Sequence, residues 1–332
     1  MAWPRPAHAG KEERRDELEY DVIGDVHGHA AALEALLEEL GYAERGGAYR
    51  HADPSRMVLF LGDLVDRGPE QVRSIDIPRR MRDAGTALVL MGNHEHNAIG
   101  YATPDPERPG HHLRIRGSKN RAQHQAFLDQ VGEGSGLHME LVEWMKTLPM
   151  WFETDGFRAV HACWHPDRIA LLEGHAGPDG AIREDALYES FRKGSALRDA
   201  AEIVLKGLEI DLPDGMFFHD ANGHRREKSR VRWWDRDATT FASAAIAEEG
   251  MEGLPDVALP AAARLDGMTD DLTFFGHYWM QGDPHLLTPF RTCLDFSIAK
   301  GGSLCAYSWR GEPVLDPRNL TWVGQPAPAA VP

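Results

Sequence analysis

The stretch that decides the fold is Met57 to Gly68, which reads M-V-L-F-L-G-D-L-V-D-R-G. Its first five residues are apolar and predict a buried strand, and the chain then turns polar beside Gly62. Two carboxylates and a guanidinium follow, from Asp63, Asp66 and Arg67. The carboxyl end of a strand is where α/β sheets hold ligands, so this ending suits a cation next to an anion. For this stretch alone, a capped turn between a strand and a helix is the alternative.

The chain repeats this arrangement four more times. In each case a short hydrophobic run ends in Asp, Asn or His, usually beside a glycine that lets another backbone come close. The endings are Gly24-Asp25-Val26-His27-Gly28 after 20–23, Gly92-Asn93-His94-Glu95 after 87–91, His161-Ala162-Cys163 after 157–160, and Gly276-His277-Tyr278 after 272–275. Five such endings predict strands that converge on a metal centre.

Composition limits the classes of protein that this chain can be. It has 332 residues, of which 42% are hydrophobic and 27% charged, and a formal net charge of -16. Such a charge argues against non-specific nucleic-acid binding. Three cysteines without a CxxC motif fit a reducing compartment, so we expect a cytoplasmic protein. No apolar run approaches the roughly 18 residues that cross a bilayer, so we expect no membrane partner.

The order of the patterns predicts an α/β layered fold. A helix is expected over residues 30–40, where leucines recur at i, i+3, i+4 and i+7, directly after the first motif. We expect one domain over 19–316 with a helical insertion around 100–150. Residues 1–18 are expected to be a mobile tail and 317–332 a loose one, because both are rich in proline.

Two basic segments interrupt the acidic chain, at 111–121 and 224–236. The first is either a solvated loop or a loop that faces an anionic substrate. The second, which contains Trp233 and Trp234, is either an edge strand with solvated arginines or a strand that brings an arginine to a substrate phosphate. The residues themselves leave both alternatives open.

The side chains at the five endings are ligands of a particular kind. They offer carboxylate, amide and imidazole donors without thiolates, which favours Mn²⁺, with Fe or Zn²⁺ as alternatives. Asp63 is able to bridge two cations, and two ions that share a bridge activate water for attack on phosphorus. The candidate metal ligands are Asp25, His27, Asp63, Asn93, His161 and His277.

The remaining polar residues of the motifs fit catalytic roles. His94 is placed to act as the general acid that protonates the leaving oxygen. Asp66 would hydrogen-bond that imidazole, and Arg67 would bind phosphate through its forked guanidinium. Taken singly, a surface histidine and an Asp–Arg salt bridge are the plain alternatives.

At this point the residues match a family. The sequences at 24–28, 62–68 and 92–95 resemble the three signature motifs of the phosphoprotein phosphatases, within the calcineurin-like metallophosphoesterases. The bacterial diadenosine tetraphosphatases belong to the same group. The resemblance is specific over about residues 20–100, and after that it is sparse, with His161-Ala162 and Gly276-His277 standing where the family has its two later metal histidines.

The resemblance implies a four-layer α/β/β/α sandwich and assigns roles at the site. Asp25, His27 and Asp63 would hold one divalent ion, and Asp63, Asn93, His161 and His277 the second. It supports His94 as the acid, Asp66 as its partner and Arg67 on phosphate. Ser229-Arg230-Val231-Arg232 looks like a phosphate-binding segment of the dinucleotide enzymes, so Arg230 is the expected second phosphate-binding arginine, with Arg232 behind it. His161-Ala162 also resembles that branch.

We therefore predict an enzyme, a two-metal phosphoesterase that hydrolyses phosphate monoesters, as protein phosphatases do, by attack of a water shared by the ions. The alternative is a dinucleoside polyphosphate hydrolase, and a third possibility is a metal-binding pseudoenzyme. The partner is a phosphorylated substrate, whether phosphoprotein, nucleotide or dinucleotide. The motifs describe the reacting phosphorus and leave the rest of the substrate open.

Overall fold

The fold is built on two β-sheets. We describe it from a computed structural model, which covers residues 18–213, 215–219, 225–246, 253–265 and 268–324. The larger sheet has the strand order β14–β15–β1–β4–β5, and β16 pairs with the outer side of β15. Strands β1, β4 and β5 are parallel, and β15 is antiparallel to β1. The bounds are β1 Glu19–Ile23, β4 Arg56–Phe60, β5 Ala87–Val89, β14 Asp295–Phe296, β15 Ser303–Trp309 and β16 Leu320–Gly324.

The smaller sheet has the order β13–β12–β7–β6. Strand β12 runs parallel to both β13 and β7, and β6 closes the edge as an antiparallel partner of β7. The bounds are β6 Trp151–Glu153, β7 Phe157–Val160, β12 Leu272–Phe275 and β13 Arg291–Cys293.

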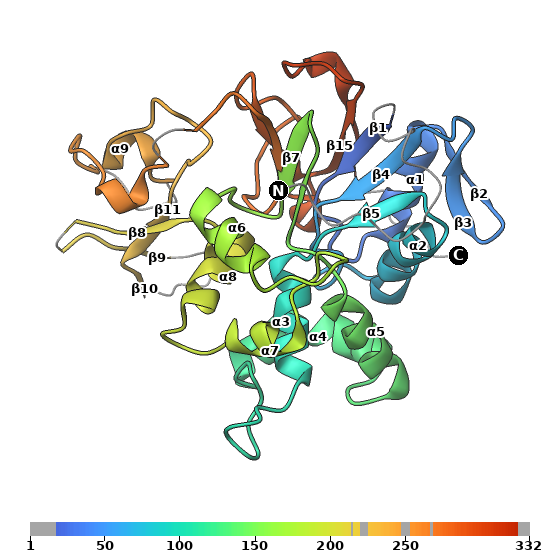
Figure 1. Ribbon diagram of the computed structural model, residues 1–332, viewed down its shortest axis with the longest axis horizontal. Coiled ribbons are helices and arrows are strands. Elements are labelled where there is room, and N and C mark those ends of the chain that lie inside the picture. The colour runs from blue at the N-terminus through green and yellow to red at the C-terminus, as the bar shows by residue number, and fades with distance from the viewer. Residues whose placement is uncertain (1–17, 214, 220–224, 247–252, 266–267, 325–332) are drawn as a thin grey trace.

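Alternate residues of the strands point to two different cores, as the period of a strand requires. Val22 and Leu59 of the larger sheet join Phe157 and Phe274 of the smaller sheet in one buried cluster between the sheets. The opposite faces belong to a second cluster that includes the helices, as Ile23, Phe60, Val160 and Phe275 do. Helices α1 and α2 lie by the larger sheet, and α6 and α8 by the smaller (Figure 1). This is the α/β/β/α sandwich that the sequence predicted.

The helices follow the strands in the expected order. The helix predicted over 30–40 is α1, and the region around 100–150 holds α4 and α5 (Figure 1). Their bounds are α1 Ala30–Glu39, α2 Gln71–Asp83, α3 Asn93–Ala102, α4 Ser118–Val131, α5 Gly136–Lys146, α6 Pro166–Glu173, α7 Glu184–Glu189, α8 Ala196–Lys206 and α9 Phe241–Ala244. Among the described residues, no helix is both long and apolar enough to cross a membrane.

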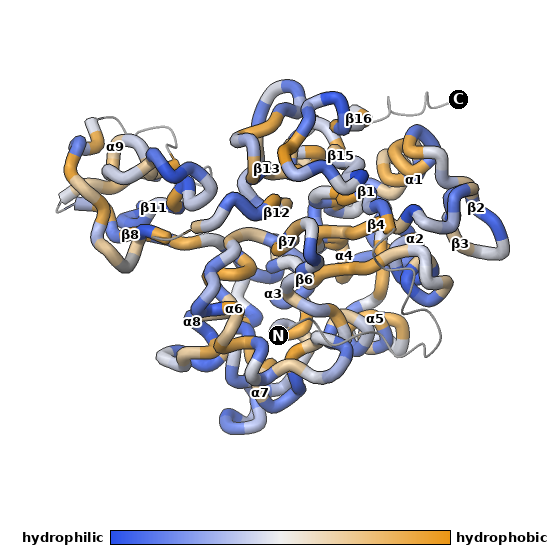
Figure 2. Tube along the Cα trace, turned by 45° about the horizontal axis from the view of Figure 1, so that its top comes forward, coloured by the Kyte–Doolittle hydropathy of each residue, from blue (hydrophilic) through white to orange (hydrophobic). Residues whose placement is uncertain are grey.

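A group of short ladders lies to one side of the two main sheets (Figures 1 and 2). Strand β8 pairs with β11 and β9 with β10, and the hairpin of β2 and β3 lies on the other side of the molecule. Trp233 and Trp234, just after β11, are buried, and the indole N–H of Trp233 donates to the carbonyl of Ala162 at 3.0 Å. The two tryptophans are therefore core residues that fix β11 beside the end of β7. The bounds are β2 Tyr42–Arg45, β3 Ala48–His51, β8 Glu209–Asp211, β9 Phe218–His219, β10 Arg225–Arg226 and β11 Lys228–Arg230.

One expectation about the ends of the chain is wrong. Residues 317–324 were expected to begin a loose tail, but Pro317–Asn319 forms a 3-10 turn and Leu320–Gly324 is the edge strand β16. Leu320 is buried against the core between the sheets, which explains why this segment is ordered. Residues 1–17 and 325–332 lie outside the part of the chain that the structure describes.

Candidate metal centre

The five polar endings meet at one edge of the two sheets. The backbone N–H groups of Val26 and His27 donate to the carbonyl of Asp63, at 3.1 and 2.8 Å, so the loops after β1 and β4 are joined directly. The N–H of Gly276 donates to the carbonyl of His161 at 2.8 Å, which joins the loops after β7 and β12. The parallel strands thus deliver their carboxyl ends to a common site, as in other α/β proteins.

Two glycines let these loops come close enough. A Cβ on Gly92 would lie 2.2 Å from the backbone nitrogen of Asp63, and one on Gly276 would lie 2.0 Å from Oδ1 of Asp25. Real Cβ atoms do not approach other atoms so closely. Glycine at these two positions is therefore a requirement of the site.

Asp63 lies at the centre of the predicted ligands. Its Oδ2 is 3.6 Å from Nε2 of His27 and 3.4 Å from Nε2 of His161. Nε2 of His161 is also 3.1 Å from Oδ1 of Asn93. The backbone N–H of His277 donates to the carboxylate of Asp25 at 3.2 Å. All six predicted ligands are buried, and the structure brings them together.

The donors fit divalent cations. In His27 and His161, Nδ1 faces a backbone carbonyl, of Val65 at 3.0 Å and of Leu61 at 2.8 Å. An imidazole that donates from Nδ1 presents the lone pair of Nε2, as a metal ligand must. Nε2 of His27 and both ring nitrogens of His277 are buried without a hydrogen-bond partner among the described residues. Because a buried polar atom without a partner is costly, these nitrogens indicate cation sites.

The ligand atoms form two groups that share one carboxylate. The first consists of His27, Asp63 and His94, and the second of Asp63, His161 and His277, with the ligand atoms of each group within 4.8 Å of one another. Asp63 belongs to both, which is the arrangement expected of a carboxylate between two ions. By proximity alone, His94 would also count as a metal ligand. The contact that its Nδ1 atom makes distinguishes it from the ligands.

That contact is with Asp66. Nδ1 of His94 lies 2.5 Å from Oδ2 of Asp66, as predicted from the sequence. Oδ1 of the same carboxylate lies 2.6 Å from Nδ1 of His124, a residue of α4 that sequence reasoning did not identify. Nothing in the local sequence of α4 marks this histidine, because its partner comes from a distant loop. The carboxylate is thus held from both sides.

Buried acids set the electrostatics of the site. Burial, followed by the carboxylate of Asp295, raises the pKa of Asp25 well above its usual value. Burial alone would lower the pKa of His161, but the carboxylate of Asp63 raises it to about 10. Asp295, in β14, is a further buried carboxylate beside Asp25 and Asp63, and the sequence analysis missed it. Three carboxylates in one buried place require nearby cations, in agreement with the unpartnered imidazoles.

Glu95 is a further residue that was missed as a functional position. Its Oε2 accepts hydrogen bonds from the N–H groups of Asp63, at 2.8 Å, and Gly92, at 2.9 Å, while Oε1 accepts one from Leu64 at 2.8 Å. The side chain therefore fixes the loop after β4 to the start of α3. Its position in the Gly92–Glu95 motif was the available signal.

Two cationic side chains lie over the ring of Trp279 at the open side of the site. The guanidinium of Arg67 lies 4.2 Å from the ring centre of Trp279, and the ammonium of Lys300 lies 4.0 Å from it. Trp279 and Lys300 were not predicted. The charge of Arg230 lowers the pKa of His277, after the larger effect of burial, so Arg230 lies close to the site. Arg232 is exposed.

The backbone is strained where the ligands lie. Among the described non-glycine residues, seven have φ in the left-handed region, and all but Ser297 belong to the loops of the site. They are His27, Asp63, Asp66, Arg67, His277, Trp279 and Ser297. Such conformations cost energy and cluster at functional sites, so the surrounding structure must hold them.

Comparison with known proteins agrees with the geometry. The model of the family described as calcineurin-like phosphoesterase matches residues 19–212. A relative from Geobacillus sp. (strain WCH70), named bis(5'-nucleosyl)-tetraphosphatase PrpE (asymmetrical), is 34% identical over 195 residues, which cover 54% of this chain and 76% of the relative. A relative of the same name from Oceanobacillus iheyensis is 39% identical over 77 residues, or 23% of this chain and 30% of that protein.

The relative from Oceanobacillus iheyensis and two further relatives of the same name are matched over only 30–39% of their own length. Among solved structures, a protein serine/threonine phosphatase from Saccharomyces cerevisiae aligns with a TM-score of 0.45 at 13% identity, over 95% of this chain and 82% of that chain.

Proposed function

The chain belongs to the calcineurin-like phosphoesterase family, and we propose that it is a hydrolase of phosphoric esters whose substrate is a dinucleoside polyphosphate. One observation carries this choice. The relative from Geobacillus sp. that is matched over 76% of its length is named a bis(5'-nucleosyl)-tetraphosphatase. The His161-Ala162 pair, which resembles the dinucleotide branch, supports the same choice. The sequence alone favoured phosphate monoesters, and the name of this relative supports the dinucleotide alternative instead.

The ligand assignment is part of the proposal. Asp25, His27 and Asp63 would hold one divalent ion, and Asp63, Asn93, His161 and His277 would hold a second. Mn²⁺ is the favoured metal, because the donors are oxygen and nitrogen atoms without thiolates. Such ions supply Lewis acidity, which activates water as a nucleophile and offsets the charge of the phosphoryl oxygens.

The protein's own groups then act on the two ends of the scissile bond. Nε2 of His94 donates a proton to the leaving oxygen, while Asp66 holds Nδ1 at 2.5 Å and keeps the ring oriented. Arg67 and Arg230 bind the phosphoryl oxygens and keep the phosphorus in line with the attacking water. Each of these residues is an expected contributor to turnover.

Hydrolysis of phosphate monoesters is the second candidate. The oriented His94–Asp66 pair favours it, because an alkoxide leaving group needs a proton more than a phosphate leaving group does. A phosphoprotein would be one such substrate. The two candidates use the same metal centre and differ in what lies beyond the reacting phosphate.

A paired turnover assay distinguishes them. Purified protein is stripped of metal, refilled with Mn²⁺, and offered diadenosine tetraphosphate or an aryl phosphate monoester. We expect a higher kcat/KM for the dinucleotide and release of nucleotides. The His94→Ala variant should lose turnover of both substrates, and His219→Ala, which removes an exposed histidine, should lose neither. A higher kcat/KM for the monoester would instead select the second candidate, and no turnover of either would overturn both.

A further inference from the structure

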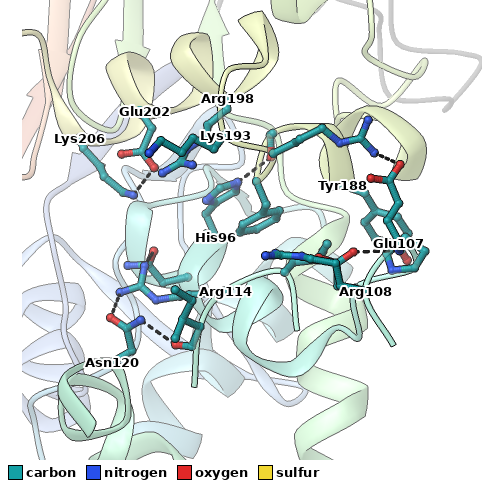
Figure 3. A pocket seen from close by; sticks show the side chains of 18 residues that line it. His96, Glu107, Arg108, Arg114, Asn120, Tyr188, Lys193, Arg198, Glu202 and Lys206 are labelled. Carbon is teal, nitrogen blue, oxygen red and sulfur yellow. Dashed lines mark hydrogen bonds and ion pairs between the residues drawn. The ribbon is translucent and has the colours of Figure 1, made fainter. Parts of the chain in front are cut away.

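A second cavity lies outside the metal centre. It has a volume of about 580 Å³ and is bounded by α3, the loop 105–115, and the segment 188–206 around α8 (Figure 3). It begins at His96 and Asn97, about one helical turn from His94. None of the six proposed metal ligands lines it. The cavity is therefore a separate site beside the catalytic one.

The lining is strongly cationic. Six of its residues are Lys or Arg and three are Asp or Glu, which gives a formal charge of +3 in a chain whose total is -16. A cationic surface on an acidic protein attracts anions locally, and the walls of a cavity strengthen the field. The charged residues are Arg108, Arg114, Arg192, Lys193, Arg198 and Lys206, with Asp105, Glu107 and Glu202.

Among the described residues, the guanidinium of Arg114 forms no ion pair with a carboxylate. Its guanidinium donates to amide oxygens, those of Asn97, of Asn120 at 2.9 Å and of Gln123 at 3.3 Å. Burial lowers the pKa of Arg114, and the carboxylates of Glu202 and Asp66 oppose that shift only in part. Neutral acceptors orient the guanidinium while leaving its charge available to a ligand.

Two more cations are available on the opposite side of the cavity. Neither Lys193 nor Arg198 has an ion-pair partner within the described ranges of the chain, whereas Lys206 pairs with Glu202 at 2.5 Å. Figure 3 shows Lys206, Arg198 and Arg114 lying around the His96 imidazole. Burial first, and then these three cations, hold the pKa of His96 well below its usual value. The cavity thus brings together positive side chains, among them Lys193 and Arg198, that form no ion pair with carboxylates of the described residues.

The cavity also has an apolar wall. Leu113, Ile115, Tyr188 and Phe191 line it, and the side chain of Ile115 is 75% exposed. Its volume falls within the range of about 300–1,000 Å³ that is usual for small-molecule sites. Clustered cations beside aromatic and aliphatic side chains match a ligand with a polyanionic part and a flat apolar part.

We propose that this cavity binds a nucleoside polyphosphate, with its phosphates between Arg114, Lys193 and Arg198 and its base against Ile115 and Tyr188. The inference uses the lining residues alone and does not depend on the proposed reaction. The same chemistry has two sources, a free nucleotide or the far half of a dinucleotide whose reacting phosphate lies at the metal centre.

Calorimetric titration of the full chain tests the proposal. ATP is titrated in the presence of a chelator, so that the metal centre contributes neither hydrolysis nor metal-mediated binding. We expect ATP to bind more tightly than inorganic triphosphate, and adenosine to bind weakly. Replacing both free cations, Lys193→Ala with Arg198→Ala, should weaken ATP binding at least tenfold. The control Arg183→Ala, which removes an exposed arginine outside the cavity, should bind as the wild type does.

The outcomes separate this proposal from the catalytic one. Equal ATP affinity in the double variant and the wild type would overturn the site, and triphosphate that binds as tightly as ATP would overturn the base contact. Lys193→Glu, a change at an exposed position, repeats the test if the double variant loses its circular dichroism. If the far half of a dinucleotide is the ligand, the double variant should raise KM for diadenosine tetraphosphate more than for the aryl phosphate. If the protein does not hydrolyse diadenosine tetraphosphate, the proposed reaction fails, and the ATP titration still tests the cavity.

Discussion

Oδ1 of Asp66 lies 2.6 Å from Nδ1 of His124, which stands 58 positions further along the chain. Burial alone would raise the pKa of Asp66, but His94 and His124 hold it below the usual value, so the carboxylate is ionised and accepts from both rings. His124 is therefore a positioning residue for the proposed acid, because it fixes the carboxylate that orients His94.

Replacing His124 tests that role. In His124→Phe the carboxylate loses one of its two donors, so we expect kcat to fall about tenfold or more with little change in KM, as for other second partners of catalytic groups. His124→Asn, which keeps a donor, should recover part of the loss. A change in KM alone would assign His124 to substrate binding instead, and thermal denaturation of each variant shows whether folding is affected.

Glu95→Gln should destabilise the protein. Both carboxylate oxygens accept backbone N–H bonds, from Asp63, Gly92 and Leu64, and a glutamine would present an NH₂ group to at least one of these donors. A buried donor left without an acceptor costs about 1–3 kcal/mol, measurable by urea unfolding. Glu143→Gln, at a position that is 61% exposed, is the matched control and should change little. Equal stability of the two variants would contradict the bridging role.

Gly276→Ala should disrupt metal binding. The added Cβ would lie 2.0 Å from Oδ1 of Asp25, so either the loop or the carboxylate has to move. We expect a marked loss of bound Mn²⁺ by atomic absorption and a parallel loss of activity. Gly136→Ala, in α5, meets no atom within 4 Å and should retain full metal content. Normal metal content in Gly276→Ala would show that Asp25 is not a ligand.

Lys300→Met should weaken the binding of anionic substrates. The Lys300 ammonium is exposed and lies over the same Trp279 ring as Arg67, on the open side of the metal centre. We expect KM to rise about three- to tenfold at low salt, with the difference shrinking as salt screens the charge. Arg318→Met, another exposed cation, should leave KM as it is. A KM that does not respond to salt in either protein would argue against an electrostatic role.

His96 should make the protein sensitive to acid. Its imidazole is buried in α3, faces Lys206, Arg114 and Arg198, and has a pKa lowered well below 6.5, so it stays neutral in the folded state. In the unfolded chain it binds a proton below about pH 6.5. Its contribution to stability is therefore complete above that pH and is lost as the pH falls below it, by up to about 1.4 kcal/mol for each pH unit.

The measurement is the free energy of unfolding against pH for wild type and His96→Gln. The variant should lose less stability between pH 6.5 and 5 than the wild type, although it starts from a lower value because it no longer stacks fully on Phe191 at 4.0 Å. His111→Gln, at an exposed position, should follow the wild-type curve. Parallel curves for wild type and His96→Gln would show that His96 titrates normally.

Much of the candidate metal centre was predictable because its residues are encoded locally. Each candidate ligand stands at the end of a short hydrophobic run, and a run of this kind predicts a strand whatever the rest of the chain does. Asp63 and Asn93 follow neighbouring parallel strands, so their convergence followed from the order of the elements. His94 and Asp66 were predicted in the same way, from motifs adjacent to ligands.

Only the tertiary structure decided the rest, because those features depend on residues that are far apart in the sequence. His124 reaches Asp66 from another helix, and Asp295 reaches Asp25 from the far end of the chain. Strand β16 was expected to be part of a loose tail because prolines lie on both sides of it in the sequence. Pairing with β15 stabilises it, and the local sequence does not show that pairing. The left-handed backbone of Asp63 and His277 likewise has no local cause, since only the surrounding contacts offset its strain. The hydrophobic pattern of the sequence thus determined which loops form the site. Long-range packing determined which residues contact the site from behind, as His124 and Asp295 do, and it formed the cationic cavity beside the site.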